Sequence, residues 1–259
     1  MLIKLLVKQL EMLCNNSYVK KITENERGCK MEFLVIAIVS LIVGMLLRYL
    51  FDFNLKEIKK LAEKPDLDKI IEKYPVNQQV AKEMLKKLNN EKVKIEENEN
   101  AESSLYVAIS DKIFIGKIQK SYTRIQTIAH ECLHSIQSRK VLLFHFIFSN
   151  LYLLYFLVIA ILGILKILPY EMTFLVGFIL MAMLFYAIRV YLENDAMTKA
   201  PFLAKEYMKE KQISSKEEVE QVISGYDELN RIGIMAVDYK LFIGIMLKIF
   251  ILSMIFFIF

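Results

Sequence analysis

Four long runs of apolar residues alternate with polar stretches along this 259-residue chain. The first run lies within residues 31–51, two more fill residues 141–192, and the last occupies residues 241–259. At the rise of an α-helix, each run is about long enough to cross the hydrocarbon core of a bilayer. We therefore expect four transmembrane helices. The middle two, separated by a short break at Pro169, should form a hairpin that returns the chain to the side of the membrane it left.

The first polar stretch, residues 52–140, contains both helical and strand patterns. Pro65 and Pro75 separate short helical segments, which we expect at residues 55–63, 67–74 and 76–88. Alternating apolar residues then predict a small sheet, with strands at 93–97 and within 105–115 and a turn at Ser110-Asp111. A longer helix should run from Ser121, a suitable N-cap, to Arg139. The second polar stretch, residues 193–240, is also expected to be helical.

Lysine and arginine residues gather in the two polar stretches, whereas the tip of the expected hairpin has only Lys166. The positive-inside rule therefore places both polar stretches in the cytoplasm and predicts a multi-pass protein of the cell membrane. Residues 1–30 form an N-terminal extension of open status, because translation can start at Met1 or at Met31. They contain no small-residue cleavage site typical of a signal peptide.

Composition agrees with an integral membrane protein whose main partner is the lipid bilayer. Hydrophobic residues make up 55% of the chain, which includes 17 phenylalanines. The net charge of +5 is modest, and no basic cluster is interleaved with aromatic residues, so nucleic-acid binding is not expected. The three cysteines have no spacing that suggests a disulfide framework or a cysteine-based metal site.

The most specific motif is His-Glu-x-x-His at residues 130–134. On a helix, His130 and His134 lie one turn apart on the same face, so both imidazoles can bind one metal ion. This is the spacing that a tetrahedral Zn²⁺ requires of two nitrogen ligands. Apolar residues recur on the opposite side of the same helix, at Ile125, Ile128, Ala129, Cys132, Leu133 and Ile136. The helix is therefore expected to pack through this stripe and to present the histidines to a polar cleft.

A third protein ligand is expected, because catalytic zinc sites usually have three and leave a position for water. No other histidine is suitable, so the ligand should be a carboxylate on the same side of the membrane. The first acids after the hairpin are Glu193 and Asp195. Glu193 is the preferred ligand. Asp195 either accepts a hydrogen bond from the other ring nitrogen of a ligand imidazole or replaces Glu193 as the ligand.

The motif, the hairpin that follows it and the Glu-x-Asp-Ala sequence at residues 193–196 together resemble the bacterial membrane-bound neutral zinc metallopeptidases. They are more distantly similar to the prenyl-protein and heat-shock membrane gluzincins. The resemblance covers roughly residues 31–259. It implies a mainly α, integral membrane fold whose cytoplasmic metal-site region is zincin-like and α+β. It also implies Zn²⁺ on His130, His134 and Glu193, with Glu131 as the catalytic base.

The chain departs from these families at three places. The family tends to carry a short histidine-containing stretch ahead of the strands, where this chain has Glu99-Asn100-Ala101-Glu102. Leu133 precedes the second histidine where the family usually has glycine, and a helix accepts this exchange. Met197 takes the place of an acid found in the more distant relatives, so a role for Asp195 does not follow from the resemblance.

The expected activity is hydrolysis of peptide bonds in protein or peptide substrates that are associated with the membrane. Glu131 would accept the proton of the attacking water and deliver it to the leaving amine. The donor that stabilises the oxyanion is open among Tyr207, Tyr226, Arg231 and Tyr239. Two other functions remain alternatives: a metal-dependent membrane hydrolase of non-peptide substrates, and a non-catalytic membrane scaffold stabilised by zinc. Glu131 favours catalysis, because a scaffold needs no base there.

Overall fold

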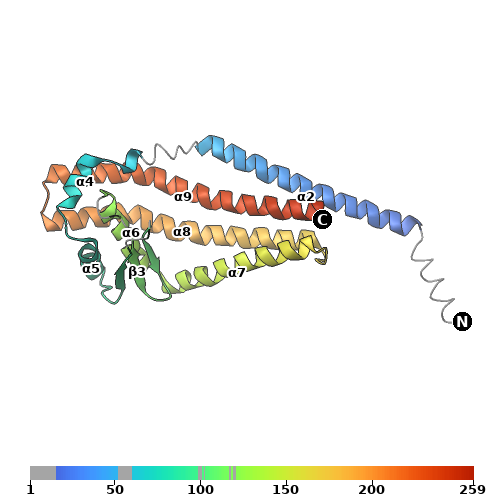
Figure 1. Ribbon diagram of the computed structural model, residues 1–259, viewed down its shortest axis with the longest axis horizontal. Coiled ribbons are helices and arrows are strands. Elements are labelled where there is room, and N and C mark those ends of the chain that lie inside the picture. The colour runs from blue at the N-terminus through green and yellow to red at the C-terminus, as the bar shows by residue number, and fades with distance from the viewer. Residues whose placement is uncertain (1–15, 52–59, 99–100, 102, 117, 119–120) are drawn as a thin grey trace. The chain divides into compact units, whose positions relative to one another are not determined.

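The structure, a computed structural model, describes residues 16–51, 60–98, 101, 103–116, 118 and 121–259. It is mostly helical and has a single small sheet within these residues (Figure 1). The described chain divides into two compact units. The apolar unit comprises Met1–Leu46, Leu153–Ala182 and Ile243–Phe259, and the polar unit comprises Leu47–Tyr152 and Met183–Phe242.

Four helices in the described residues are long and apolar enough to cross a membrane, which confirms the predicted number and is consistent with a multi-pass membrane protein. They are α2 (Asn16–Phe51), α7 (Arg139–Ile164), α8 (Glu171–Lys211) and α9 (Lys216–Ile258). Helices α8 and α9 have 41 and 43 residues, about twice the length that a bilayer requires. The second polar stretch therefore consists mainly of the polar ends of these two helices.

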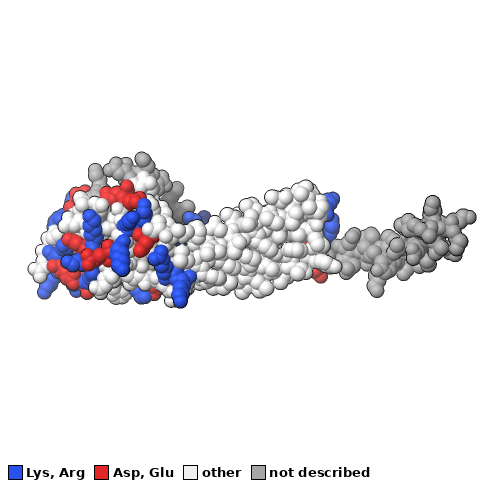
Figure 2. All heavy atoms as spheres, turned by 90° about the horizontal axis from the view of Figure 1, so that it is seen from below, with Lys and Arg blue, Asp and Glu red and all other residues white. Residues whose placement is uncertain are grey.

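The apolar unit is held together by aromatic contacts between helices. The ring centroids of Phe33 and Phe256 are 5.4 Å apart, and those of Phe156 and Phe178 are 5.7 Å apart. Many other apolar side chains of these helices are exposed, as is expected of surfaces that face lipid. In Figure 2 the charged side chains gather over the polar unit, whereas the visible surface of the apolar unit carries very few.

The polar unit contains three short helices and the sheet. The helices are α4 (Pro65–Glu72), α5 (Asn77–Lys87) and α6 (Arg124–Ile136), and the strands are β1 (Lys94–Glu97), β2 (Leu105–Val107) and β3 (Lys112–Ile115). Pro65 opens α4, where its missing N–H costs nothing. Most of the helix expected at residues 55–63 lies outside the described residues. The strand β3 is central, with β1 parallel on one side and β2 antiparallel on the other.

The hairpin between β2 and β3 is shorter than its alternating pattern predicted. Strand β2 ends at Val107, and Ile109 lies in the turn with 51% of its surface exposed. Asp111 closes this turn with a φ of 52°, and Lys94 donates a hydrogen bond from its backbone N–H to the Asp111 carbonyl oxygen. Strand β3 therefore begins to pair with β1 directly after the turn. This pairing sets the residue at which the turn ends.

Helix α6, which carries the histidine motif, is also shorter at both ends than predicted. Ser121 is not its N-cap: the helix begins at Arg124, preceded by Thr123. It ends at Ile136 because Gln137 adopts an extended backbone, and a separate helix, α7, starts at Arg139. The predicted apolar stripe is buried from Ile125 to Leu133, but Ile136 at the end of the helix is 47% exposed.

The core of the polar unit surrounds α6. Ile125, Ile128, Ala129 and Cys132 are each 0% exposed and pack among residues of α4, α5, α8, α9 and the sheet. Arg124 is buried beside them, and its guanidinium donates hydrogen bonds to the carbonyl oxygens of Ile71, Tyr74 and Pro75 and to Oδ1 of Asn77. These contacts fasten the first turn of α6 to the connection between α4 and α5.

Candidate metal centre

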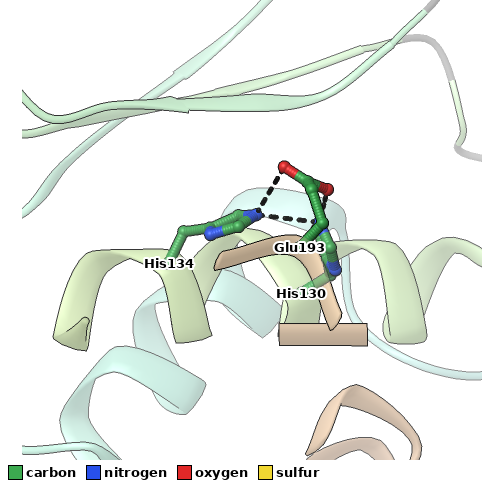
Figure 3. A group of neighbouring side chains, drawn as sticks. All are labelled: His130, His134 and Glu193. Carbon is green, nitrogen blue, oxygen red and sulfur yellow. Dashed lines mark hydrogen bonds and ion pairs between the residues drawn. The ribbon is translucent and has the colours of Figure 1, made fainter. Parts of the chain in front are cut away.

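Helices α6 and α8 bring two histidines and one carboxylate together in the polar unit (Figure 3). His130 and His134 lie on one face of α6, and Glu193 faces them from α8. The Nε2 atoms of the two imidazoles are 3.0 Å apart, and each lies 3.6 Å from a carboxylate oxygen of Glu193. The preferred set of predicted ligands is thus assembled, while Asp195, the substitute, is not part of it.

The donor set fits a small divalent ion. Ligand atoms that surround a tetrahedral Zn²⁺ at its usual bond length lie roughly 3.3 Å from one another. The observed separations of 3.0 and 3.6 Å are on either side of this value. Two imidazole nitrogens and a carboxylate are also ligands that zinc favours. Among the described residues, no fourth His, Cys, Asp or Glu joins the group, so a position for water or substrate would stay open.

Gln137, rather than the predicted Asp195, orients the imidazole of His134. The Nδ1–H of His134 donates to Oε1 of Gln137 over 2.8 Å, which leaves Nε2 for a metal. The amide nitrogen of Gln137 donates in turn to the carbonyl oxygen of Leu192 and to Oδ2 of Asp195, at 2.8 and 3.0 Å. Asp195 therefore accepts its hydrogen bond from Gln137 and not, as predicted, from the imidazole of a ligand histidine. The extended backbone of Gln137, which ends α6, places its side chain between α6 and α8.

Glu131 is buried next to the two ligand histidines and is only 6% exposed. Burial raises the pKa of its carboxyl to about 7, although the charge of His130 and the backbone N–H of Tyr106 on β2 oppose the increase. A carboxyl group with a pKa in this range can both accept and donate a proton near neutral pH. Edge strand β2 thus lies beside the residue that the sequence predicts to be the base.

Burial has the opposite effect on His134. Together with the neighbouring His130, it lowers the pKa of His134 to about 4. The imidazole of His134 is therefore neutral at neutral pH, which is the form that binds metals.

Arg189 is a member of the site that the sequence analysis missed. It lies one turn before Glu193 on α8, and its guanidinium is 2.8 Å from Oε1 of that carboxylate. Its side chain is 42% exposed. The spacing of four residues between Arg189 and the preferred ligand was the available signal, because such pairs share a helix face.

The four residues predicted as oxyanion donors do not meet at this centre. The hydroxyl of Tyr207 donates to Glu83 and that of Tyr226 to the carbonyl oxygen of Tyr122, so both are engaged elsewhere. Arg231 is exposed on α9 and Tyr239 is half-buried on the same helix. Neither belongs to the described residues that line the cavity beside His130 and Glu193.

That cavity has a volume of about 340 Å³ and lies between α6, α8 and α9. His130 and Glu193 form part of its wall, so it opens directly onto the candidate metal ligands. The centre therefore combines a set of metal ligands, a buried carboxyl, an arginine and a space that a substrate can enter.

No protein-family model, curated protein or solved structure matches this chain. The resemblance to membrane zinc peptidases, which depends on the His-Glu-x-x-His motif and the sequence after the hairpin, therefore stays a prediction. The function has to be inferred from the chemistry of the residues themselves.

Proposed function

We propose that the chain is a zinc metallopeptidase of the cell membrane that hydrolyses peptide bonds in membrane-associated proteins. The observation that carries the proposal is the convergence of His130, His134 and Glu193, with Glu131 in the same turn of α6. A structural zinc site would have four protein ligands. The described residues provide three, which favours catalysis over the alternative of a scaffold.

The roles of the side chains follow from their positions. When bound, Zn²⁺ would polarise the scissile carbonyl group and acidify a water molecule. Glu131 would accept a proton from the attacking water and deliver it to the leaving amine. Gln137 keeps Nε2 of His134 directed toward the ligand cluster. Arg189 is a further candidate for the oxyanion donor, because its guanidinium lies 2.8 Å from the carboxylate of Glu193.

Strand β2 supports a peptide as the substrate. Within the described residues it pairs with β3 on one side only, and the backbone of its Tyr106 contacts Glu131. A free strand edge at this place can align an extended peptide through backbone hydrogen bonds. A small non-peptide substrate would make no use of such an edge, so we favour peptide hydrolysis over the other hydrolase alternative.

The sequence around Glu193 supports membrane-associated substrates and a cytoplasmic site. Glu193 directly follows the apolar run that ends at residue 192, on the same helix. The ligands belong to the polar stretches that hold most lysine and arginine residues, which favours the cytoplasmic face.

The proposal is tested with the full chain purified in detergent. We expect about one zinc ion per chain and cleavage of casein or of a membrane protein. Glu131→Gln should keep the zinc and lower the cleavage rate by about 100-fold or more, since a general base is lost. Glu91→Gln, at an exposed position, is the matched control and should cleave normally.

Three outcomes would contradict the proposal in different ways. Unchanged cleavage by Glu131→Gln would exclude that residue as the base. Absence of zinc from the purified protein would exclude the metal centre. Bound zinc without any cleavage by the unchanged chain would favour the scaffold.

A further inference from the structure

The cavity beside the metal ligands is formed by three helices that each contribute one regularly spaced face. One face consists of Thr123, directly before α6, with Gln126, Thr127 and His130 of α6; α8 contributes Glu193, Met197 and Ala200; and α9 contributes Leu229, Asn230, Gly233 and Val237. These spacings of three and four residues are those of a single helix face. Ala62 completes the described lining. Among the described residues, the cavity is thus lined mainly by packed helices.

The candidate metal ligands lie at one end of this cavity. His130 is the last lining residue on α6, and Glu193 is the first on α8. Seven residues separate Thr123 from His130 and also Glu193 from Ala200, which corresponds to about 10 Å along each helix. A group that enters the cavity from the metal ligands can therefore extend well beyond the scissile bond.

The wall of the cavity offers little to a charged ligand. Glu193 is the only charged residue among the described lining residues, and it is paired with Arg189. The two amide side chains are engaged with each other and with the backbone. Gln126 donates to Oδ1 of Asn230 over 3.3 Å, and Asn230 donates to the carbonyl oxygen of Met197 over 2.9 Å. The rest of the described wall consists of the apolar residues alanine, leucine, methionine, glycine and valine together with Thr123, Thr127 and His130.

The width of the cavity depends on Gly233 and Met197. A Cβ atom added to Gly233 would lie 3.1 Å from the terminal methyl carbon of Met197, across the space between α9 and α8. Any larger side chain at position 233 would therefore occupy the cavity. Methionine is flexible, so Met197 can move to admit ligands of somewhat different shapes.

We propose that this cavity binds the side chain of the substrate residue next to the scissile bond and selects large apolar residues such as Leu, Met and Phe. The inference depends on the proposed peptidase function and specifies its substrate class. An apolar side chain gains free energy when it leaves water for such a wall, whereas a charged one would lose its hydration without a partner. Gly233 leaves space that the terminal methyl group of Met197 fills, so a ligand that enters here has to move this flexible side chain.

The first test compares cleavage of quenched fluorescent peptides that differ only at the residues flanking the scissile bond. The unchanged protein should cleave peptides with Leu or Phe at one of these positions at least about tenfold faster than those with Asp or Lys. Gly233→Leu should lower kcat/KM for the Leu and Phe peptides by about tenfold or more and change that for an Ala peptide much less. Met197→Ala should shift the preference toward Phe.

The control is Gly244→Leu, the same exchange on the same helix. A Cβ atom at Gly244 meets nothing within 4 Å, and this residue does not line the cavity. Gly244→Leu should therefore leave both the rate and the preference unchanged.

A binding measurement separates failure of this inference from failure of the proposed function. A labelled Leu-containing peptide is titrated into Glu131→Gln protein, which should bind it without rapid cleavage, and into the double variant with Gly233→Leu. We expect the second variant to bind at least about tenfold more weakly. If cleavage requires Glu131 but Gly233→Leu affects all peptides equally, or if charged residues are preferred, the side-chain pocket is wrong and the peptidase stands. If no peptide is cleaved by the unchanged protein, both proposals are wrong.

Discussion

Gln137 has contacts to both helices of the metal centre. It accepts a hydrogen bond from His134 of α6 and donates to Leu192 and Asp195 of α8. Its role depends on one amide group that offers an acceptor on one side and a donor on the other. The position of the imidazole on α6 is therefore tied to the helix that carries the third ligand.

Replacing Gln137 by Ala should weaken zinc binding by about 10–100-fold, because the ligand imidazole loses the partner that orients it. Competition with a fluorescent zinc chelator measures this change. Ser138→Ala, at the exposed neighbouring position, should bind zinc normally. Equal zinc affinity in the Gln137→Ala protein would mean that the hydrogen bond to His134 does not support the site.

Arg189 should matter for the reaction more than for metal binding. Arg189→Met removes the guanidinium, and we expect kcat/KM to fall by about 100–1000-fold, as is typical when an oxyanion donor is lost. Arg189→Lys should recover only part of the rate, because lysine keeps the charge but lacks the planar fork. Zinc content is measured in parallel. Loss of zinc instead of loss of rate would show that Arg189 only positions Glu193.

At the level of elements, α6 is fastened at its first turn by a buried side chain. Arg124 donates to three carbonyl oxygens and one amide oxygen at the end of α4 and the start of α5. A compact ammonium group cannot reach four such acceptors in this arrangement. The histidines follow on the same helix, so the position of α6 in the core also sets the position of the ligands.

Arg124→Ala should therefore destabilise the polar unit strongly, by about 3 kcal/mol, since several buried acceptors lose their donor. Thermal unfolding in detergent, followed by tryptic cleavage, reports the change. Arg124→Lys should remain clearly less stable than the unchanged protein. If either variant unfolded at the normal temperature, these hydrogen bonds would contribute no net stability.

A contact between α5 and α8 should make stability depend on pH. Glu83 on α5 accepts hydrogen bonds from Lys211 and Tyr207 on α8. Partial burial alone would raise the pKa of Glu83, but these bonds hold it below its usual value. A carboxylate with a lowered pKa stabilises the fold above its unfolded pKa, and this contribution is lost as the pH falls through the lower folded value.

The unchanged protein should therefore exceed Glu83→Gln in unfolding temperature by about 2 °C at pH 7, with the difference shrinking below about pH 4. The control is Lys82→Gln, which alters a neighbouring charge on α5. Its unfolding temperature should change with pH in the same way as that of the unchanged protein. If the unfolding temperatures of the unchanged protein and Glu83→Gln differed by the same amount at pH 7 and below about pH 4, the assigned role of the carboxylate would be contradicted.

For the whole molecule, the sequence predicts that both polar stretches lie in the cytoplasm and that the hairpin tip lies outside. A background with Cys14→Ser and Cys29→Ser allows single reporter cysteines to be labelled in intact cells. Cys132 can stay, because it is buried and burial raises the pKa of its thiol. A cysteine at Lys166 should react with an impermeant maleimide, whereas cysteines at Glu91 or Lys216 should react only after permeabilisation. Labelling of all three from outside would exclude this orientation.

The four apolar helices and the grouping of His130, His134 and Glu193 could be predicted because each depends on a short-range pattern. Length and hydropathy define the spans, and the spacing of His130 and His134 defines a helix face. The hairpin then limits the third ligand to Glu193 or Asp195. Parallel pairing of β1 with β3 was not predictable in this way, because it skips β2 and depends on packing over a long sequence separation.

The contacts of Gln137, Arg189 and Arg124 were missed for a related reason. Their side chains are long, and where such a side chain reaches depends on the placement of other helices. The same applies to Ser121 and Ile136, whose predicted roles assumed that α6 continued from 121 to 139. The extended backbone at Gln137 ends the helix earlier, and it is stabilised by contacts with α8 that no local pattern contains.

Helix α8 runs without interruption from Glu171 to Lys211 and carries Arg189, Glu193 and Met197 along one rod. Each residue of an α-helix advances the azimuth by 100°. Deleting one residue between positions 183 and 188 would turn the following part of the helix relative to the part before it. The carboxylate at the ligand position would then face away from the imidazoles. Activity should thus be lost because the side chain of Glu193 points in another direction around the helix axis, even though every residue of the centre is still present.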